Sequence, residues 1–148
     1  MNSIVQTGVV IGVAIVAGLV LGFQAPMNAV ISGRVGLFAG SLIVHIGGLL
    51  ASLLILLLLR GENISQWQSI PRWYFISGAL GVIVVVGFAY SFPQIGAANT
   101  VTLVVAGQLI GALLIDQFGW FGATVKAIEP LRIGGTVLLL MGAYLMSR

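Results

Sequence analysis

The chain contains a stretch of 43 consecutive residues, positions 73–115, without one charged side chain. An α-helix rises about 1.5 Å per residue, so this stretch would be roughly 65 Å long as a single helix. The hydrocarbon core of a bilayer is only about 30 Å thick and takes about 20 helical residues to cross. The stretch is therefore long enough for two crossings. A break between them is predicted at 92–96, where Pro93 and Gly96 interrupt the apolar sequence.

Three further runs, at 1–33, 35–59 and 133–147, are also free of Asp, Glu, Lys and Arg. Only helices and closed barrels satisfy the backbone in lipid, and the alternating ten-residue segments of a barrel are missing from this sequence. We therefore predict an all-α, polytopic membrane protein that forms a single membrane domain over 1–148. Pro26 leaves open whether its first helix ends near 23 or extends to 31. The five transmembrane helices are expected at about 4–23, 37–59, 73–91, 95–115 and 131–147.

The composition agrees with a membrane location, since 59% of the residues are hydrophobic and only 6% are charged. Soluble domains carry about 25% charged residues. A soluble enzyme, a disordered tail or a nucleic-acid-binding domain is thereby excluded as the main body of the chain. One histidine, three scattered acids and no cysteine do not make a metal cluster or a nucleophile with its base. We expect no enzymatic activity, no metal, no cofactor and no nucleic-acid partner.

An odd number of helices places the two termini on opposite sides of the membrane. On the side of the N-terminus the predicted helices are flanked by four basic residues: Arg60, Arg72, Lys126 and Arg132. On the other side there are two: Arg34 and Arg148. This difference is a weak positive-inside signal, which slightly favours a cytoplasmic N-terminus and allows insertion in both orientations. Three aromatic residues on the four-charge side are the expected interface anchors: Trp73, Tyr74 and Trp120.

Glycine makes up 21 of the 148 residues, about twice the usual share of ~7%. Small residues let helices approach closely in lipid, and four glycines of the first predicted helix fall on one side of it. The expected helix-packing positions are Gly8, Gly12, Gly18, Gly22, Gly40, Gly47, Gly107 and Gly111. Such a face would act either as a seam along which helices rock or as a static packing surface.

A few polar side chains interrupt the predicted spans. His45 is the one ionisable residue well inside a span, and it shares a stripe of the second helix with Ser41. Its alternative role is that of a neutral structural histidine bonded to a carbonyl. Gln24 and Asn28 would share a face if the first helix continues through Pro26, where they would bind a polar ligand group or satisfy a helix end. The candidate substrate-binding residues are Gln24, Asn28, Ser41, His45 and Gln108.

Several segments resemble a known family. They are Gly-Phe-Gln-Ala-Pro-Met-Asn at 22–28, Pro-Gln-Ile-Gly-Ala-Ala at 93–98, Val-Ala-Gly-Gln-Leu-Ile at 105–110, and Leu-Ile-Asp-Gln-Phe-Gly-Trp-Phe-Gly at 114–122. The chain resembles the YdcZ-like family of bacterial five-helix proteins, which are half-size relatives in the drug/metabolite transporter superfamily. The resemblance implies one five-helix repeat in the bacterial inner membrane, of the kind that larger members carry twice in inverted orientation. It implies no substrate.

We expect a small-molecule transporter that works by alternating access in an antiparallel dimer. The partner would be a second copy of the chain or a homologous chain inserted in the opposite direction. Walls almost free of charge suit a neutral or amphipathic substrate. The small multidrug transporters carry an essential glutamate in their first helix, and this chain has no acid there, so their proton-exchange mechanism is not expected. The alternatives are a non-transporting subunit of a larger membrane complex and a passive channel.

Overall fold

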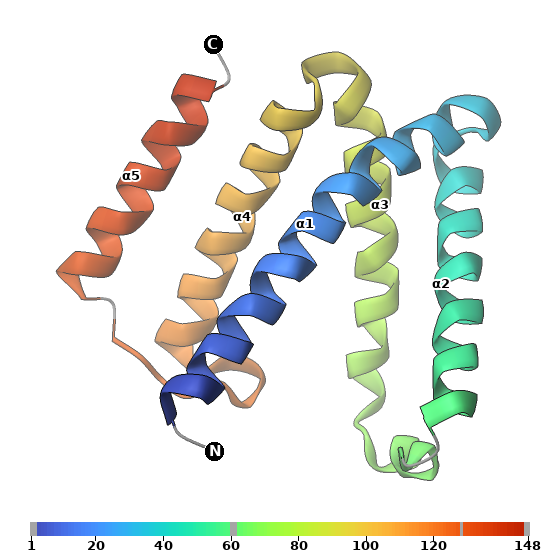
Figure 1. Cartoon of the computed structure of the whole chain (residues 1–148), viewed down its shortest axis with the longest axis horizontal. Helices are drawn as coiled ribbons and strands as arrows, with labels where there is room; N and C mark the ends of the chain where they lie inside the picture. Colours follow the sequence, from blue (N-terminus) through green and yellow to red (C-terminus); the bar gives the residue numbers. More distant parts are fainter. Residues whose placement is uncertain (1–2, 60–61, 128, 147–148) are drawn as a thin grey trace. The chain divides into compact units, whose positions relative to one another are not determined.

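The computed structural model describes residues 3–59, 62–127 and 129–146, and its regular structure in these ranges is entirely helical (Figure 1). The α-helices are α1 (Ser3–Val35), α2 (Leu37–Leu59), α3 (Ile76–Ile95), α4 (Ala97–Phe118) and α5 (Pro130–Met146). The predicted all-α fold with five helices is confirmed. Arg60 and Arg148, two of the basic residues in the topology argument, lie outside the described residues, as does residue 147 at the expected end of the fifth helix.

Four helical segments of the described ranges are long and apolar enough to cross a membrane. Three of them belong to α1, α2 and α4. The fourth, Arg72–Ile95, consists of the 3-10 helix η2 (Arg72–Phe75) and α3, which follows it directly. The fifth helix, α5, has 17 residues, which is the lower end of the range of about 17–25 residues that spans a bilayer. Of two further 3-10 helices, η1 (Ile64–Ser69) lies between α2 and η2, and η3 (Trp120–Gly122) lies between α4 and α5.

The first helix is longer than both expected lengths, which ended at 23 and at 31. It runs through Pro26 and ends at Val35, so it contains 33 residues. Proline removes one backbone hydrogen bond, which transmembrane helices tolerate because neighbouring groups satisfy the freed carbonyl. In the same way α3 runs through Pro93 to Ile95. The break predicted over 92–96 is therefore confined to Gly96.

Single glycines form two of the corners between helices. Gly36 is the one residue between α1 and α2, Gly96 is the one residue between α3 and α4, and their φ angles are +94° and +79°. Residues other than glycine rarely adopt such φ angles. The Gly36 amide donates to the Ser32 carbonyl at 2.8 Å, and the Gly36 carbonyl accepts from the Gly40 amide at 2.8 Å. Gly36 thus continues the hydrogen bonding of α1 into α2.

The chain divides into two compact units, Met1–Pro93 and Gln94–Arg148. In the first unit α1 packs against α2, and in the second unit α4 packs against α5. That the whole chain works as a single membrane domain stays a prediction.

The contact between α1 and α2 is made by small residues. One face of α1 is buried over two turns, with the spacing of a helix stripe, at Ala25, Asn28, Ala29 and Ser32. On α2, Gly40 lies so close to Ser32 that an added Cβ would be 2.8 Å from the Ser32 Cα. Such an approach is possible only because position 40 has no side chain.

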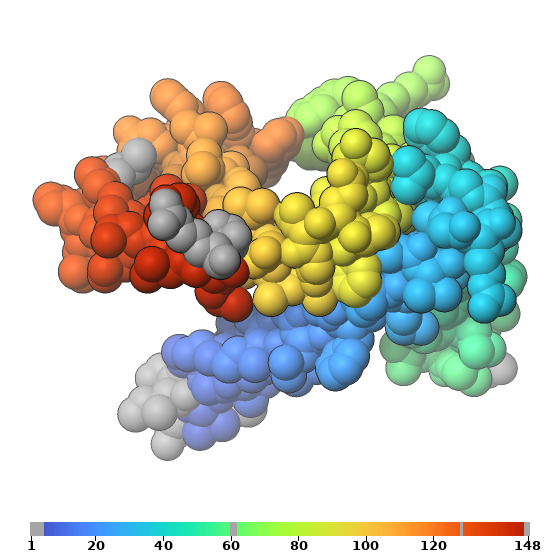
Figure 2. Space-filling view, turned by 90° about the horizontal axis from the view of Figure 1, so that it is seen from above, coloured from blue at the N-terminus to red at the C-terminus, as the bar shows by residue number. Residues whose placement is uncertain are grey.

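The N-terminal half of α1 is uncovered. Residues 5–20 are all exposed, and Figure 2 shows this half of the helix, in dark blue, reaching away from α2. A Cβ added at Gly8, Gly12, Gly18 or Gly22 would meet nothing within 4 Å. The same is true of the three remaining packing candidates, Gly47, Gly107 and Gly111. A packing role for these glycines stays a prediction.

Candidate functional site

The first unit contains a cavity of about 530 Å³, widely open to its surroundings, to which α1, α2 and α3 all contribute. Three of the lining side chains are polar: Gln24, His45 and Ser52. Four are aliphatic: Val44, Leu49, Val84 and Val85. Two glycines complete the wall: Gly48 and Gly81. Apolar walls with a few polar groups are typical of small-molecule sites.

The helix pitch explains why α2 provides so much of this lining. Val44, His45, Gly48, Leu49 and Ser52 follow the i, i+1, i+4, i+5, i+8 spacing of a single helix face. The opposite face of α2 is leucine and isoleucine, which suits contact with lipid. α2 therefore has one face toward the cavity and another suited to the bilayer.

The imidazole of His45 is held in place by the preceding turn of α2. Its Nδ1 lies 2.7 Å from the backbone oxygen of Ser41 and 3.4 Å from the Ser41 Oγ. Ser41 itself is buried, with 1% of its surface exposed. A carbonyl oxygen only accepts hydrogen bonds, so the close contact with Nδ1 requires a proton on that nitrogen. The other ring nitrogen, Nε2, faces α3, where a Cβ added at Gly81 would lie 3.1 Å from it.

Ser52 and Gln24 complete the polar part of the lining. The Ser52 hydroxyl donates to the Gly48 carbonyl at 2.8 Å, which leaves its oxygen lone pairs as acceptors. Gln24 lies on the exposed part of α1, and its amide can both donate and accept. No Asp, Glu, Lys or Arg is among the described residues that line the cavity.

The structure brings together some of the predicted substrate-binding residues. Gln24 and His45 line the same cavity, and Ser41 supports His45 from behind it. Asn28 is buried on the α1 face that carries Ala25 and Ser32, and it is not part of the lining. Gln108 is an exposed residue of α4 in the second unit and is also outside the lining. Binding of a substrate by any of the five stays a prediction.

The contribution of α3 was not expected from the sequence. Gly81, Val84 and Val85 line the cavity, but the first three turns of α3 contain only one polar residue, Ser77. Nothing in the local sequence therefore distinguishes the cavity-facing side of this helix from its other side.

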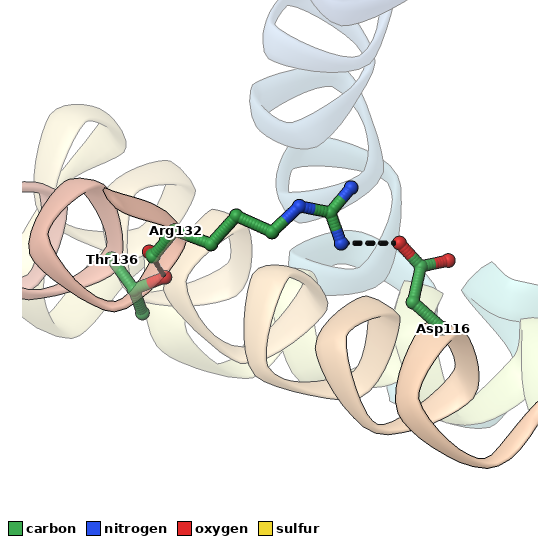
Figure 3. A network of polar contacts seen from close by, with 3 residues as sticks. All are labelled: Asp116, Arg132 and Thr136. Carbon is green, nitrogen blue, oxygen red and sulfur yellow. Dashed lines mark hydrogen bonds and ion pairs between the residues drawn. The ribbon is translucent and has the colours of Figure 1, made fainter. Parts of the chain in front are cut away.

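A second polar feature lies between α4 and α5. Arg132 of α5 donates from Nη1 to Oδ2 of Asp116 on α4 at 3.0 Å, and the Thr136 hydroxyl donates to the Arg132 carbonyl at 2.8 Å (Figure 3). The two charged side chains are 35–36% exposed. They border a groove of about 400 Å³ whose other walls include Leu109, Leu113 and Leu139. The sequence could have predicted this pair, because the chain has few charged residues and these two, of opposite sign, lie on consecutive helices.

The three predicted interface anchors lie in or beside the 3-10 turns that connect the helices. Trp73 stacks on Tyr74 with ring centroids 3.8 Å apart, and Trp120 stacks on Phe118 at 5.2 Å. All three anchors are exposed, as side chains at a bilayer surface would be. Within the described part of the chain, no three His, Asp or Glu side chains come together as a metal site.

Comparison with known proteins gives a family. The sequence matches the family described as "Putative inner membrane exporter, YdcZ" over residues 9–145. It is also 38% identical over 88 residues to "Inner membrane protein YdcZ" of Escherichia coli (strain K12), a stretch that covers 60% of this chain and 56% of that relative. The chain thus aligns with little more than half of the relative's length. No solved structure matches the chain. Since the family match covers nearly all of the sequence, this chain belongs to the YdcZ family of inner membrane proteins, which is of the drug/metabolite transporter type.

Proposed function

We propose that this protein exports small amphipathic molecules across the inner membrane, by alternating access in an antiparallel pair of five-helix subunits. The observation that carries the proposal is the cavity of α1, α2 and α3, in which Gln24 and His45 lie among aliphatic walls. The family description supports export as the direction of transport.

The positions of Gln24 and His45 along their helices support a substrate site near the middle of the membrane. Gln24 precedes Arg34, the charged residue in the last turn of α1, by ten residues, or about 15 Å along the helix. His45 lies eight residues, or about 12 Å, into α2. Both distances are close to half of the hydrocarbon thickness of about 30 Å. Transporters built from inverted repeats bind their substrates at this depth.

The lining also supports a class of substrate. Aliphatic side chains from α2 and α3 favour an apolar body, and the polar groups of the wall require hydrogen-bonding partners. A strongly charged molecule would find no opposite charge in this lining. An amphipathic molecule with a small polar head fits both parts of the wall.

Two features support an antiparallel pair. With five helices, a second copy inserted in the opposite direction reproduces the inverted arrangement of transporters with two repeats. The uncovered N-terminal half of α1, with Gly8 and Gly12 one turn apart, offers a face on which another helix could pack closely.

Transport is tested in everted membrane vesicles that contain the protein. The probes are N-phenyl-1-naphthylamine, which is neutral and amphipathic, and ethidium, which is a permanent cation. We expect energy-dependent, saturable uptake of the neutral probe, reduced by about two- to tenfold in Gln24→Ala, the effect of one neutral hydrogen bond, and unchanged in Gln6→Ala. Gln6 is the matched control because it is an exposed glutamine in the uncovered half of the same helix. Flux that does not saturate would point to a channel, and no flux would point to an accessory subunit.

The antiparallel pair is tested by fusing alkaline phosphatase or green fluorescent protein to the C-terminus. These reporters are active on opposite sides of the inner membrane. Activity of both fusions is expected for a chain that inserts in two orientations. Activity of only one would exclude the antiparallel homodimer and leave an oppositely inserted homologous chain as the partner to search for.

A further inference from the structure

We infer that the cavity selects molecules with a hydrogen-bond donor on an apolar body, because His45 presents an unprotonated Nε2 to it. The inference rests on the proposed function, since it names the substrate class of the same cavity. It makes the Ser41 carbonyl the positioning group for the His45 ring and Gly81 the residue that controls access to Nε2.

The first step is the tautomer of His45. A neutral imidazole carries one proton, and the Ser41 carbonyl, 2.7 Å from Nδ1, holds that proton on Nδ1. The Ser41 Oγ lies 3.4 Å from the same nitrogen. Because the buried side of the ring provides both contacts, the tautomer is set before any ligand arrives. Nε2 is then a hydrogen-bond acceptor.

The second step is the access to Nε2. This nitrogen faces Gly81 of α3, and a Cβ at that position would lie only 3.1 Å from it. A methyl group there would cover the acceptor or displace the ring by a few tenths of an ångström. Glycine places no side chain beside this nitrogen, and both residues line the cavity. Gly81 is therefore a residue that determines specificity without bonding to the ligand.

The third step is the character of the remaining lining. The Ser52 hydroxyl has used its proton on the Gly48 carbonyl, so it too accepts. His45 and Ser52 are seven residues apart, or about 10 Å along α2. One polar head therefore bonds to only one of them, and the aliphatic side chains of Leu49, Val84 and Val85 take the rest of the molecule. Hydroxyl and primary amide heads are neutral and satisfy these acceptors, whereas ethers do not.

The test uses the fact that the chain contains a single histidine. The full-length protein is labelled with ¹⁵N in the imidazole, purified with a histidine-free tag, and studied in detergent at pH 8.5, where imidazole is neutral. Two-bond ¹⁵N–¹H spectra then identify the protonated nitrogen of His45 without further assignment. We expect the proton on Nδ1. A proton on Nε2 would overturn the inference.

Ligand selection is measured in the same spectra with three probes of equal chain length. They are hexan-1-ol, hexanamide and hexyl methyl ether, all of which are neutral and of which only the first two can donate. We expect saturable shifts of the Nε2 resonance with the two donors and none with the ether, which controls for partition into the micelle. Equal shifts with all three would overturn the inference.

The role of Gly81 is tested by Gly81→Ala, with Gly78→Ala as the matched control. Gly78 lies one turn earlier in α3, and a Cβ added there would meet nothing within 4 Å. We expect Gly81→Ala to weaken hexan-1-ol binding by about two- to tenfold, the effect of one neutral hydrogen bond, and Gly78→Ala to leave it unchanged. Equal binding by both folded variants would show that position 81 does not control access.

These results separate the inference from the proposed function. Saturable export in vesicles together with a proton on Nε2 would reject donor selection while the exporter remains. A proton on Nδ1 with donor-selective shifts but no export would support the inference as a binding property and reject the exporter.

Discussion

The contact of Gly40 with Ser32 predicts how strongly the α1–α2 packing contributes to stability. In Gly40→Ala the new Cβ would lie 2.8 Å from the Cα of Ser32, whereas carbon atoms prefer separations of about 3.5–4.0 Å. The Ser32 Oγ is also close and can rotate away, but the Cα is backbone and cannot, so the two helices would have to move apart by roughly 0.7–1.2 Å. Overpacking of this kind costs about 1–3 kcal/mol. The folding equilibrium would shift by roughly 5- to 160-fold.

Alanine also favours the helical state over glycine by up to about 1 kcal/mol, which opposes this loss. The control variant is therefore Gly33→Ala, at a helical position of α1 where a Cβ would meet nothing within 4 Å. The free energy of unfolding is measured in dodecylmaltoside micelles by titration with SDS and followed by tryptophan fluorescence. We expect Gly40→Ala to be the less stable of the two by about 1–3 kcal/mol.

Ser32 provides a second check on the same argument. Within the described residues its buried Oγ has no hydrogen-bond partner, so Ser32→Ala removes no bond and should change stability little. It should also fail to rescue Gly40→Ala, since the Ser32 Cα remains in the way. If Gly40→Ala unfolds at the same SDS fraction as Gly33→Ala, the close packing of α1 and α2 is refuted.

Three further changes test other parts of the structure. Gly36→Ala forces an L-residue to a φ of +94° and should destabilise the protein by about 1–3 kcal/mol; a thermal transition equal to that of wild type would contradict this geometry. Asp116→Asn breaks an ion pair that is about one-third exposed and should reduce stability by at most about 1 kcal/mol. Exchanging Asp116 and Arg132 should recover part of this loss; an exchange variant less stable than Asp116→Asn would argue against the pair. If transport is coupled to protons, His45→Gln should abolish the pH dependence of probe uptake in vesicles, because His45 is the only histidine; an unchanged pH profile would exclude that role.

The helices were predictable because their signal is long and repetitive. Runs without charge locate each span, and α2 at Leu37–Leu59 has the bounds expected from the sequence. The ends of α1 and α3 were harder to predict. A proline usually marks the end of a helix in water, yet Pro26 and Pro93 both lie inside helices here, and Gly36 and Gly96 form the corners.

Of the residues that line the cavity, only polar ones could be predicted from the sequence. His45 and Gln24 stand out because polar side chains are rare in the spans. Gly81, Val84 and Val85 belong to an apolar helix whose faces look alike in the sequence, so only the packing of α3 beside His45 identifies them. Gln108 is a polar residue inside a helix, like His45 and Gln24, but the periodicity of one helix does not predict which other helix its face will contact.

The length of α1 determines how much of the membrane plane this small protein occupies. Its 33 residues make a rod of about 50 Å, longer than the roughly 40–45 Å of a whole bilayer with its headgroups. The apolar part, residues 5–33, is about 43 Å long and fits within about 30 Å of hydrocarbon only by inclining, by bending at Pro26, or both. Inclination alone would carry one end of this part about 30 Å sideways from the other. The first helix then reaches across several lipid diameters, well beyond the footprint of an upright helix.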